Sequence, residues 1–207
     1  MPIASKDRLC EEVMNEHCDH AVCCANGPLR IRRHEDVADC VADMIDETGA
    51  HVRREAYLKA FRTESSDAWL DIWAFGGMHL PELIVDVTLR HPMVARYQPR
   101  ASRTAGYAAA EAADDKQKRY PPAQGRTVTA FALETWGRLG DSAEELLATL
   151  AAEATRHARR HGHAVTASSF MRRWRATLDA CLQRGVAAAL LAARCGLPGK
   201  SHRRWRW

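Results

Sequence analysis

One acidic residue lies inside an apolar, β-branched run, Glu82-Leu83-Ile84-Val85-Asp86-Val87-Thr88-Leu89. Such a run predicts a buried strand whose alternate side chains face opposite ways. One face carries Leu83, Val85, Val87 and Leu89, and the other carries Ile84, Asp86 and Thr88. A buried carboxylate without a partner is costly, so Asp86 requires a metal, a cation or a proton. The run therefore predicts either a metal site or a structural ion pair with one of the arginines.

A second aspartate, Asp71, begins another short apolar run, which ends at Phe75 and is followed by Gly76-Gly77. Fourteen residues separate Asp71 from Asp86. Two adjacent strands joined by a turn at the glycines would bring both carboxylates to one end of a sheet. Paired carboxylates suit a hard divalent cation such as Mg²⁺ or Mn²⁺. Taken alone, Asp71 is more typical of a strand-end or turn residue than of a metal ligand.

Helices are predicted on both sides of these strands. Residues 35–47 show helical spacing of apolar side chains, with Gly49 as a stop, and Glu55 ends the run that follows. An alanine-rich stretch, 105–120, predicts a second helix that carries Lys116 and Tyr120 four residues apart, on one face. The order helix, strand, strand, helix, with Glu, Asp, Asp and Lys, is typical of a metal-dependent nuclease.

In this order the chain resembles the restriction-endonuclease-like domain of the PD-(D/E)XK superfamily found at the C-terminal end of some non-LTR retrotransposon polyproteins. Arg33-His34-Glu35 resembles the family's Arg-His-Asn motif, with Glu in place of Asn. Leu70-Asp71-Ile72 resembles Pro-Asp-Ile, with Leu in place of Pro. Asp86 matches the second acid, and Lys116 with Tyr120 matches Lys-x3-Tyr. The segment 130–137 resembles the strand that closes the domain, and the match covers roughly residues 10 to 195.

The resemblance implies an α/β fold: a nuclease-like core with a mixed central sheet flanked by helices, a small N-terminal Cys/His segment and a C-terminal helical extension. It implies a metal-dependent DNA endonuclease that nicks target DNA during retrotransposon integration. Its catalytic residues would be Glu55, Asp71, Asp86, Lys116 and Tyr120. Asp71 and Asp86 would bind Mg²⁺ or Mn²⁺, and Lys116 would orient the attacking water or stabilise the pentavalent phosphorus. Expected DNA contacts are Arg33, His34 and, in the basic loop 92–103 over the substrate groove, Gln98, Arg100 and Arg103.

The N-terminal segment resembles part of a zinc knuckle. His20 and Cys24 match its His-x3-Cys half, and Cys10 stands where the second cysteine is expected, whereas the first position falls on Asp7. Structural zinc usually has four ligands. Candidates for the fourth are Asp7, His17, Cys18 and Cys23. The alternative is that these residues are ordinary reduced thiols in an eroded segment.

The absent first cysteine predicts a truncated copy. No reverse-transcriptase core fits within 207 residues. A reverse transcriptase or the element RNA, supplied by a full-length copy, is therefore an expected partner.

The formal charge is +4, and only five of the 30 basic residues are lysine. Arginine clusters interleaved with tryptophan suit a nucleic-acid backbone. They occur at 30–33, 156–161, 172–175 and 203–207. A GC-rich genome or solvated helix faces would produce similar clusters. With no signal peptide, no membrane span and four cysteines crowded before residue 25, we expect a reducing compartment, nuclear or cytoplasmic.

Four segments are expected along the chain. They are the Cys/His segment with the Arg-His motif, 1–34; the nuclease-like core, 35–140; C-terminal helices packed on it, 141–198; and a basic aromatic tail, 199–207. Asp141 with Glu144 predicts a helix cap. Core positions of the helices are Leu146, Leu147, Leu150, Ala154, Phe170, Trp174, Leu178 and Leu182.

Two further functions remain open. A catalytically decayed nucleic-acid-binding module would keep the fold without turnover, and Glu35, Leu70 and the missing cysteine favour it. A nuclease of DNA repair or junction resolution would share the chemistry and differ in its substrate. Lys116 also has an alternative role as a surface lysine, because it lies in the charged run 114–119.

Overall fold

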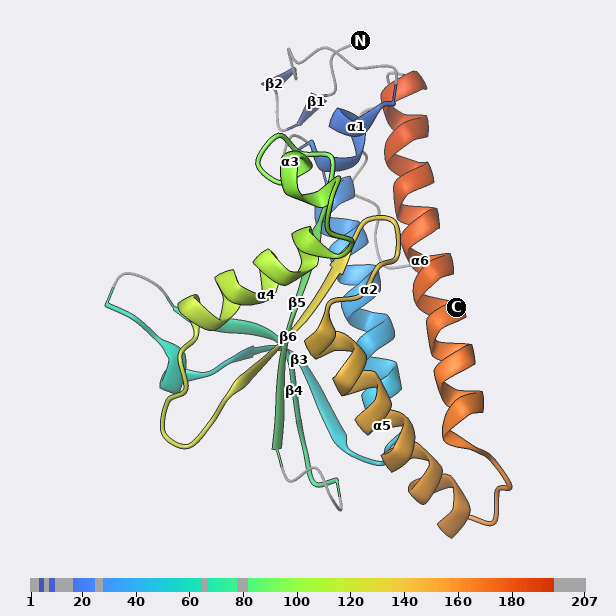
Figure 1. Ribbon diagram of the computed structural model, residues 1–207. Helices are drawn as coiled ribbons and strands as arrows, with labels where there is room; N and C mark the ends of the chain where they lie inside the picture. Colours follow the sequence, from blue (N-terminus) through green and yellow to red (C-terminus); the bar gives the residue numbers. More distant parts are fainter. Residues whose placement is uncertain are drawn as a thin grey trace.

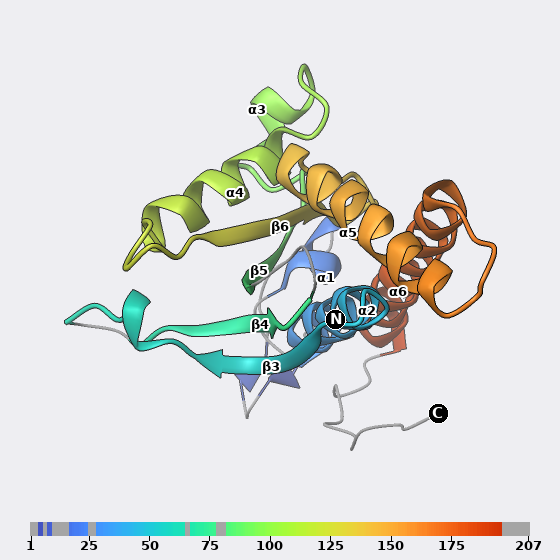
Figure 2. The same cartoon turned by 90° about the horizontal axis from the view of Figure 1, so that it is seen from below.

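A four-stranded mixed sheet lies between helices in an α/β arrangement (Figures 1 and 2). The computed structural model describes residues 4–5, 8–9, 17–24, 28–64, 67–77 and 82–195. The strands are β1 (Ala4–Ser5), β2 (Arg8–Leu9), β3 (His51–Tyr57), β4 (Trp69–Phe75), β5 (Glu82–Arg90) and β6 (Val128–Glu134). The helices are α1 (Asp19–Cys23), α2 (Leu29–Asp46), η1 (Lys59–Phe61), α3 (Gln98–Ala101), α4 (Tyr107–Arg119), α5 (Asp141–Arg160) and α6 (Ala167–Cys195).

The main sheet has the strand order β3-β4-β5-β6. β3, β4 and β5 are antiparallel neighbours, whereas β5 and β6 are parallel and are joined through α3 and α4. The central strand β5 is buried from Ile84 to Thr88. Val85 and Val87 belong to the main core, whereas Ile84 packs in a second cluster. The predicted buried strand and its two faces are therefore confirmed, as is the α/β class with a mixed sheet.

α2 and α5 cover one face of the sheet, α6 packs on the outer side of these two helices, and together they form the main core with the sheet (Figures 1 and 2). Each helix is amphipathic and turns its apolar stripe inward. The predicted core positions of α5 and α6 are all buried. The largest fully buried side chains of this core include Trp174, Met44, Ile45, Leu147 and Leu182.

The opposite face of the sheet is covered by α4 (Figure 2). Ala109 and Ala112 of α4 pack on Ala132 of β6. Such small side chains allow the helix axis to lie close to the strands. Gly106, at the N-cap with φ +83°, takes the left-handed conformation that starts this helix. The close approach matters because α4 carries Lys116 over β5.

A smaller apolar cluster joins the far end of the β3–β4 ribbon to the end of α4. Its buried members are Leu58, Phe61, Ala68, Leu70, Ile84 and Tyr120. Aromatic packing contributes, since the rings of Phe61 and Tyr120 meet edge to face with centroids 6.3 Å apart. The candidate site described below lies between this cluster and the main core.

Two predicted details of the helices are wrong. α2 begins at Leu29 rather than near Glu35. The sequence pattern missed its first turns because they carry arginines and an exposed Ile31 and so lack a buried apolar stripe. The predicted division after residue 34 therefore falls inside α2. Asp141 does not cap α5, since the N-cap is Gly140 and no side chain bonds the helix end. Asp141 lies in the first turn, where a negative charge still favours the helix dipole.

One helix of the described part of the chain, α6, is long and apolar enough to cross a bilayer by length and composition. Core helices of soluble proteins meet the same criterion, so this observation is weak evidence either way. One stripe of α6, from Phe170 to Ala193, is buried against α2 and α5. The expected location of the protein stays a prediction.

Candidate active site

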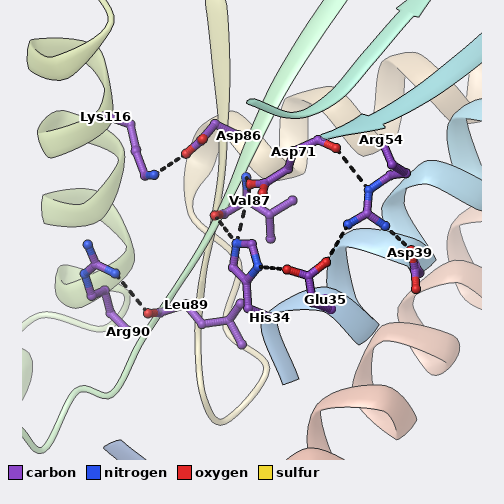
Figure 3. Close-up of polar contacts among 10 residues, drawn as sticks. All are labelled: His34, Glu35, Asp39, Arg54, Asp71, Asp86, Val87, Leu89, Arg90 and Lys116. Carbon is purple, nitrogen blue, oxygen red and sulfur yellow. Dashed lines mark hydrogen bonds and ion pairs between the residues drawn. The ribbon is translucent and has the colours of Figure 1, made fainter. Parts of the chain in front are cut away.

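Asp71 and Asp86 lie where β4 separates from β5 (Figure 3). The ladder between the two strands ends at the pair formed by Ile72 and Val85. Beyond that pair, Asp71 Oδ2 accepts a hydrogen bond from the backbone N–H of Val87 at 2.6 Å. A carboxylate thus takes the place of a backbone carbonyl, and the sheet divides at this point. The predicted pairing of the two strands is confirmed.

Asp86 is almost fully buried on β5, at 3% exposure. Lys116 of α4 lies over the same face and forms an ion pair with Asp86 Oδ2 (Figure 3). Among the described residues, the ammonium of Lys116 is the polar partner of Asp86 Oδ2. Burial raises the pKa of Asp86, the charge of Lys116 opposes this rise, and the charge of Asp71 adds to it.

His34 reaches the same point from α2 (Figure 3). Its Nε2 donates to the Val87 carbonyl oxygen at 3.0 Å and lies 3.4 Å from Asp71 Oδ2. Its Nδ1 lies 3.5 Å from Glu35 Oε1. Hydrogen bonding to Asp71 raises the pKa of His34 to about 9, although burial acts in the opposite direction. The imidazole is therefore a cation at neutral pH, next to a carboxylate.

Arg54 of β3 binds the backbone of Asp71, a role that we did not predict. Its Nε donates to the Asp71 carbonyl oxygen at 3.0 Å. Its Nη2 donates to Glu35 Oε2 at 3.1 Å, and its Nη1 pairs with Asp39 (Figure 3). Glu35 entered the prediction only as a departure from the Arg-His-Asn motif. Its position next to His34 was the available signal, whereas the pairing with Arg54 depends on the tertiary fold.

Glu55 and Tyr120 have different surroundings from the two aspartates. Glu55 lies at the position across from Asp71, but the β3–β4 register has no pair there. Glu55 is exposed and has a left-handed backbone, with φ +50°. Tyr120 is buried in the smaller apolar cluster, with Lys116 Nζ 5.9 Å from its ring centroid. Burial raises the pKa of Tyr120. The structure thus brings Asp71, Asp86 and Lys116 together and gives Tyr120 a packing position beside them.

The predicted DNA contacts fall into two groups. Arg33 is buried at 3% exposure, lies against Gly185 of α6, and donates from Nη2 to the Val22 carbonyl oxygen at 2.9 Å. It links α2 to α1 and to α6. The loop residues are exposed around α3: Gln98, Arg100 and Arg103. Of these, Arg100 donates to the hydroxyl of Tyr107 at 3.1 Å.

A cavity of about 480 Å³ opens beside Lys116 and His34. Much of its wall consists of basic residues, namely Arg30, Arg33, His34, Arg90, His91 and Lys116. No acidic residue is among the described residues that line it. Positive charge gathered in a concave wall raises the local concentration of an anionic ligand. The cavity therefore suits a phosphate-bearing molecule.

A buried hydrogen-bonded chain holds one end of this cavity. His91, which follows β5, lies 2.7 Å through Nδ1 from Thr135 Oγ1 and 3.0 Å through Nε2 from Asp19 Oδ1. The chain ties α1 to the ends of β5 and β6. We did not predict it, because Asp19 and His91 are 72 residues apart in the sequence.

The predicted zinc site is only partly within the described residues. Cys10 lies outside them, His20 is on α1, and Cys24 follows that helix. No group of three or more His, Cys, Asp or Glu side chains in the described ranges is arranged to hold a metal ion. Zinc binding stays a prediction.

The chain was also compared with known proteins. No family model matches it, and the search of curated proteins found no match. The resemblance to the restriction-endonuclease-like domain stays a prediction from the sequence motifs.

Proposed function

We propose that the chain is a metal-dependent DNA endonuclease with a PD-(D/E)XK-like core. One observation carries the proposal: β4, β5 and α4, which are separate in sequence, bring Asp71, Asp86 and Lys116 to the split in the sheet. The element order α2-β3-β4-β5-α4-β6 supports it. Two acids and a lysine brought together in this way are suited to phosphodiester hydrolysis.

The donor set fits a hard divalent cation. Asp86 is buried with Lys116 as its partner, and Asp71 lies across the split from it. Mg²⁺ commonly binds one or two carboxylates and completes its shell with water and substrate phosphate, so two aspartates suffice. Asp71 and Asp86 would hold Mg²⁺ or Mn²⁺. The ion would supply charge neutralisation at the phosphoryl oxygens and a more acidic water.

Lys116 and His34 supply the positive charge of the protein itself. The ammonium of Lys116 lies at Asp86, in position to orient a water or to stabilise charge that develops on the phosphoryl group. The hydrogen bond to Asp71 raises the pKa of His34, and the imidazole lies against that carboxylate. Arg54 holds the backbone of Asp71 through its carbonyl oxygen, which fixes the carboxylate relative to β5.

The cationic cavity beside these residues supports DNA as the substrate. Arg30 and Arg90 line it together with Lys116. Phosphate contacts of this kind give affinity without reading the base sequence. The same cavity supports a second candidate function, DNA binding without turnover, because Lys116 already pairs with one of the two carboxylates.

Nicking of supercoiled plasmid in Mn²⁺ tests the proposal. We expect wild type to nick the plasmid, EDTA to abolish nicking, and Asp86→Asn to reduce it by at least about 100-fold, since an amide is a poor ligand for a hard cation. The matched control is Asp114→Asn, an exposed acid on α4 that should leave nicking unchanged. Wild-type nicking that resists EDTA, or equal nicking by Asp86→Asn, contradicts the proposal. DNA binding with no nicking in any metal supports the binding module instead.

A further inference from the structure

The β3–β4 ribbon presents aromatic side chains on the face that also carries Asp71. Alternate residues of a strand share one side, and antiparallel pairing matches the same sides of neighbouring strands. Along β4, the residues on this face are exposed or half-buried, whereas those between them are buried. The face carries His51, Arg53, Tyr57, Trp69, Trp73 and Phe75.

Tyr57 and Trp69 form an exposed pair at one end of the ribbon. They are 41% and 61% exposed, and their ring centroids are 5.5 Å apart at an interplanar angle of 50°. Two adjacent large rings leave apolar area in water, and contiguous exposed apolar area marks a binding surface. Trp69 lies two residues before Asp71 on β4, on the same side, and Tyr57 is its partner on β3.

A second group of rings lies beyond Asp71. Trp73 and Phe75 have centroids 5.1 Å apart. The indole N–H of Trp73 donates to Glu82 Oε1 at 2.9 Å, which fixes the plane of the ring. The guanidinium carbon of Arg53 lies 5.8 Å from the Trp73 centroid, so a cation accompanies these rings.

Aromatic rings accompanied by arginine are suited to unpaired nucleotides. Every base has a π-face, so stacking on such rings tolerates any sequence, and arginine adds contacts to phosphate or base. In a duplex the base faces are already stacked on one another. The exposed carboxylate of Glu55 lies between the two ring groups and favours a strand that turns its bases, rather than its phosphates, toward the sheet.

We propose that this face of the β3–β4 ribbon binds unpaired bases of single-stranded DNA. The surface comprises Tyr57, Trp69, Trp73, Phe75 and Arg53, and it flanks the carboxylate of Asp71. The inference rests on the proposed function for the position of the cut: the substrate has an unpaired stretch next to the scissile phosphate. A second copy of the chain is the competing occupant, and the measurements below separate the two.

Binding is measured without turnover, in the Asp86→Asn background with EDTA. The probes are a fluorescent single strand of about 15 nucleotides and the duplex of the same sequence. Stacking contributes about 1–3 kcal/mol per base, so Tyr57→Ala with Trp69→Ala should weaken single-strand binding by about 10- to 100-fold. Duplex binding through the cationic cavity should change less than about threefold, because these rings make no phosphate contacts.

Two controls accompany this pair of substitutions. Trp69→Phe keeps a ring and should retain most of the single-strand affinity. Leu191→Ala removes an apolar side chain of similar exposure, 59%, from α6 and should have no effect on either probe. Quenching of wild-type tryptophan fluorescence by the single strand is an independent readout that requires no folded variant.

Equal weakening of both probes, unchanged single-strand affinity, or absence of quenching overturns the inference. A wild-type dimer that Trp69→Ala converts to a monomer would assign the face to a second copy and overturn it too. Failure of the proposed function is distinguishable. If wild type never nicks plasmid but binds the single strand, and these substitutions remove that binding, the binding surface is supported and only the proposed nuclease activity is rejected.

Discussion

Lys116 and Asp86 neutralise each other across the space between α4 and β5. The contact confirms that Lys116 faces the split, which its charged run did not guarantee. Lys118, two residues along the same helix, is exposed and points elsewhere. A comparison of the two lysines therefore tests whether Lys116 is a catalytic cation, as proposed, or only adds positive surface.

Replacement of Lys116 by alanine should reduce plasmid nicking by at least about 100-fold, as is typical when a group that stabilises transition-state charge is removed. Affinity for duplex DNA should change little, since one cation among many contributes little to binding. Lys118→Ala is the control and should keep nearly all nicking. Equal and mild effects of the two substitutions would place Lys116 in the basic surface, and the binding module would then be favoured.

Periodic patterns predicted the elements that form the centre of the fold. β5 and α4 were predictable from their patterns and lengths. A short β-branched apolar run predicts a strand, and a longer alanine-rich stretch predicts a helix. The first turns of α2 were not, because Arg30, Ile31 and Arg32 point to solvent or to the cavity and leave no apolar period. Contacts made only by tertiary folding, such as Arg54 with Asp71, leave no local signal at all.

The packing of α6 on α2 depends on a missing side chain. A Cβ at Gly185 would lie 2.6 Å from Arg33 Cγ and 2.8 Å from its Cδ, closer than van der Waals contact allows. Gly185→Ala gains about 1 kcal/mol of helix propensity but meets an overpacking cost of about 1–3 kcal/mol. We expect a net loss of unfolding free energy, of up to about 2 kcal/mol.

Urea denaturation measures this loss. Gln183→Ala, an exposed position on the same helix, should be as stable as wild type or slightly more stable. A Gly185→Ala protein more stable than wild type would mean that Arg33 moves aside without cost.

At the scale of the whole molecule, the candidate site lies between two apolar clusters that are built differently. The main core joins α2, α5 and α6 to the sheet, whereas the smaller cluster joins the end of α4 to the β3–β4 ribbon. Asp86 is buried at their junction on the central strand, among residues such as Ile84 and Val87. The fold therefore holds an acid where packing alone would favour an apolar side chain.

Replacement of both Asp86 and Lys116 by apolar residues tests whether the buried ion pair costs stability. Buried pairs can often be replaced by apolar residues with no loss of stability or with a gain of about 1–4 kcal/mol. We expect Asp86→Val with Lys116→Met to unfold at the wild-type temperature or above it, and to be inactive. Lys116→Met alone should be less stable than wild type, because it leaves a buried charge without its partner. A double variant much less stable than wild type would show that the pair is needed for folding.

The burial of Asp86 beside Lys116 has a consequence for the history of chains like this one. Under the proposed function, stability and activity make opposite demands on this pair, so mutational drift without selection for activity favours replacement of both residues by apolar side chains. Asp71 differs, because its carboxylate satisfies the Val87 N–H and its loss would leave a backbone donor unpaired. In a lineage without such activity, the pair at positions 86 and 116 would turn apolar before position 71. An intact pair of Asp86 and Lys116 is therefore what we expect of a site that is kept for its chemistry.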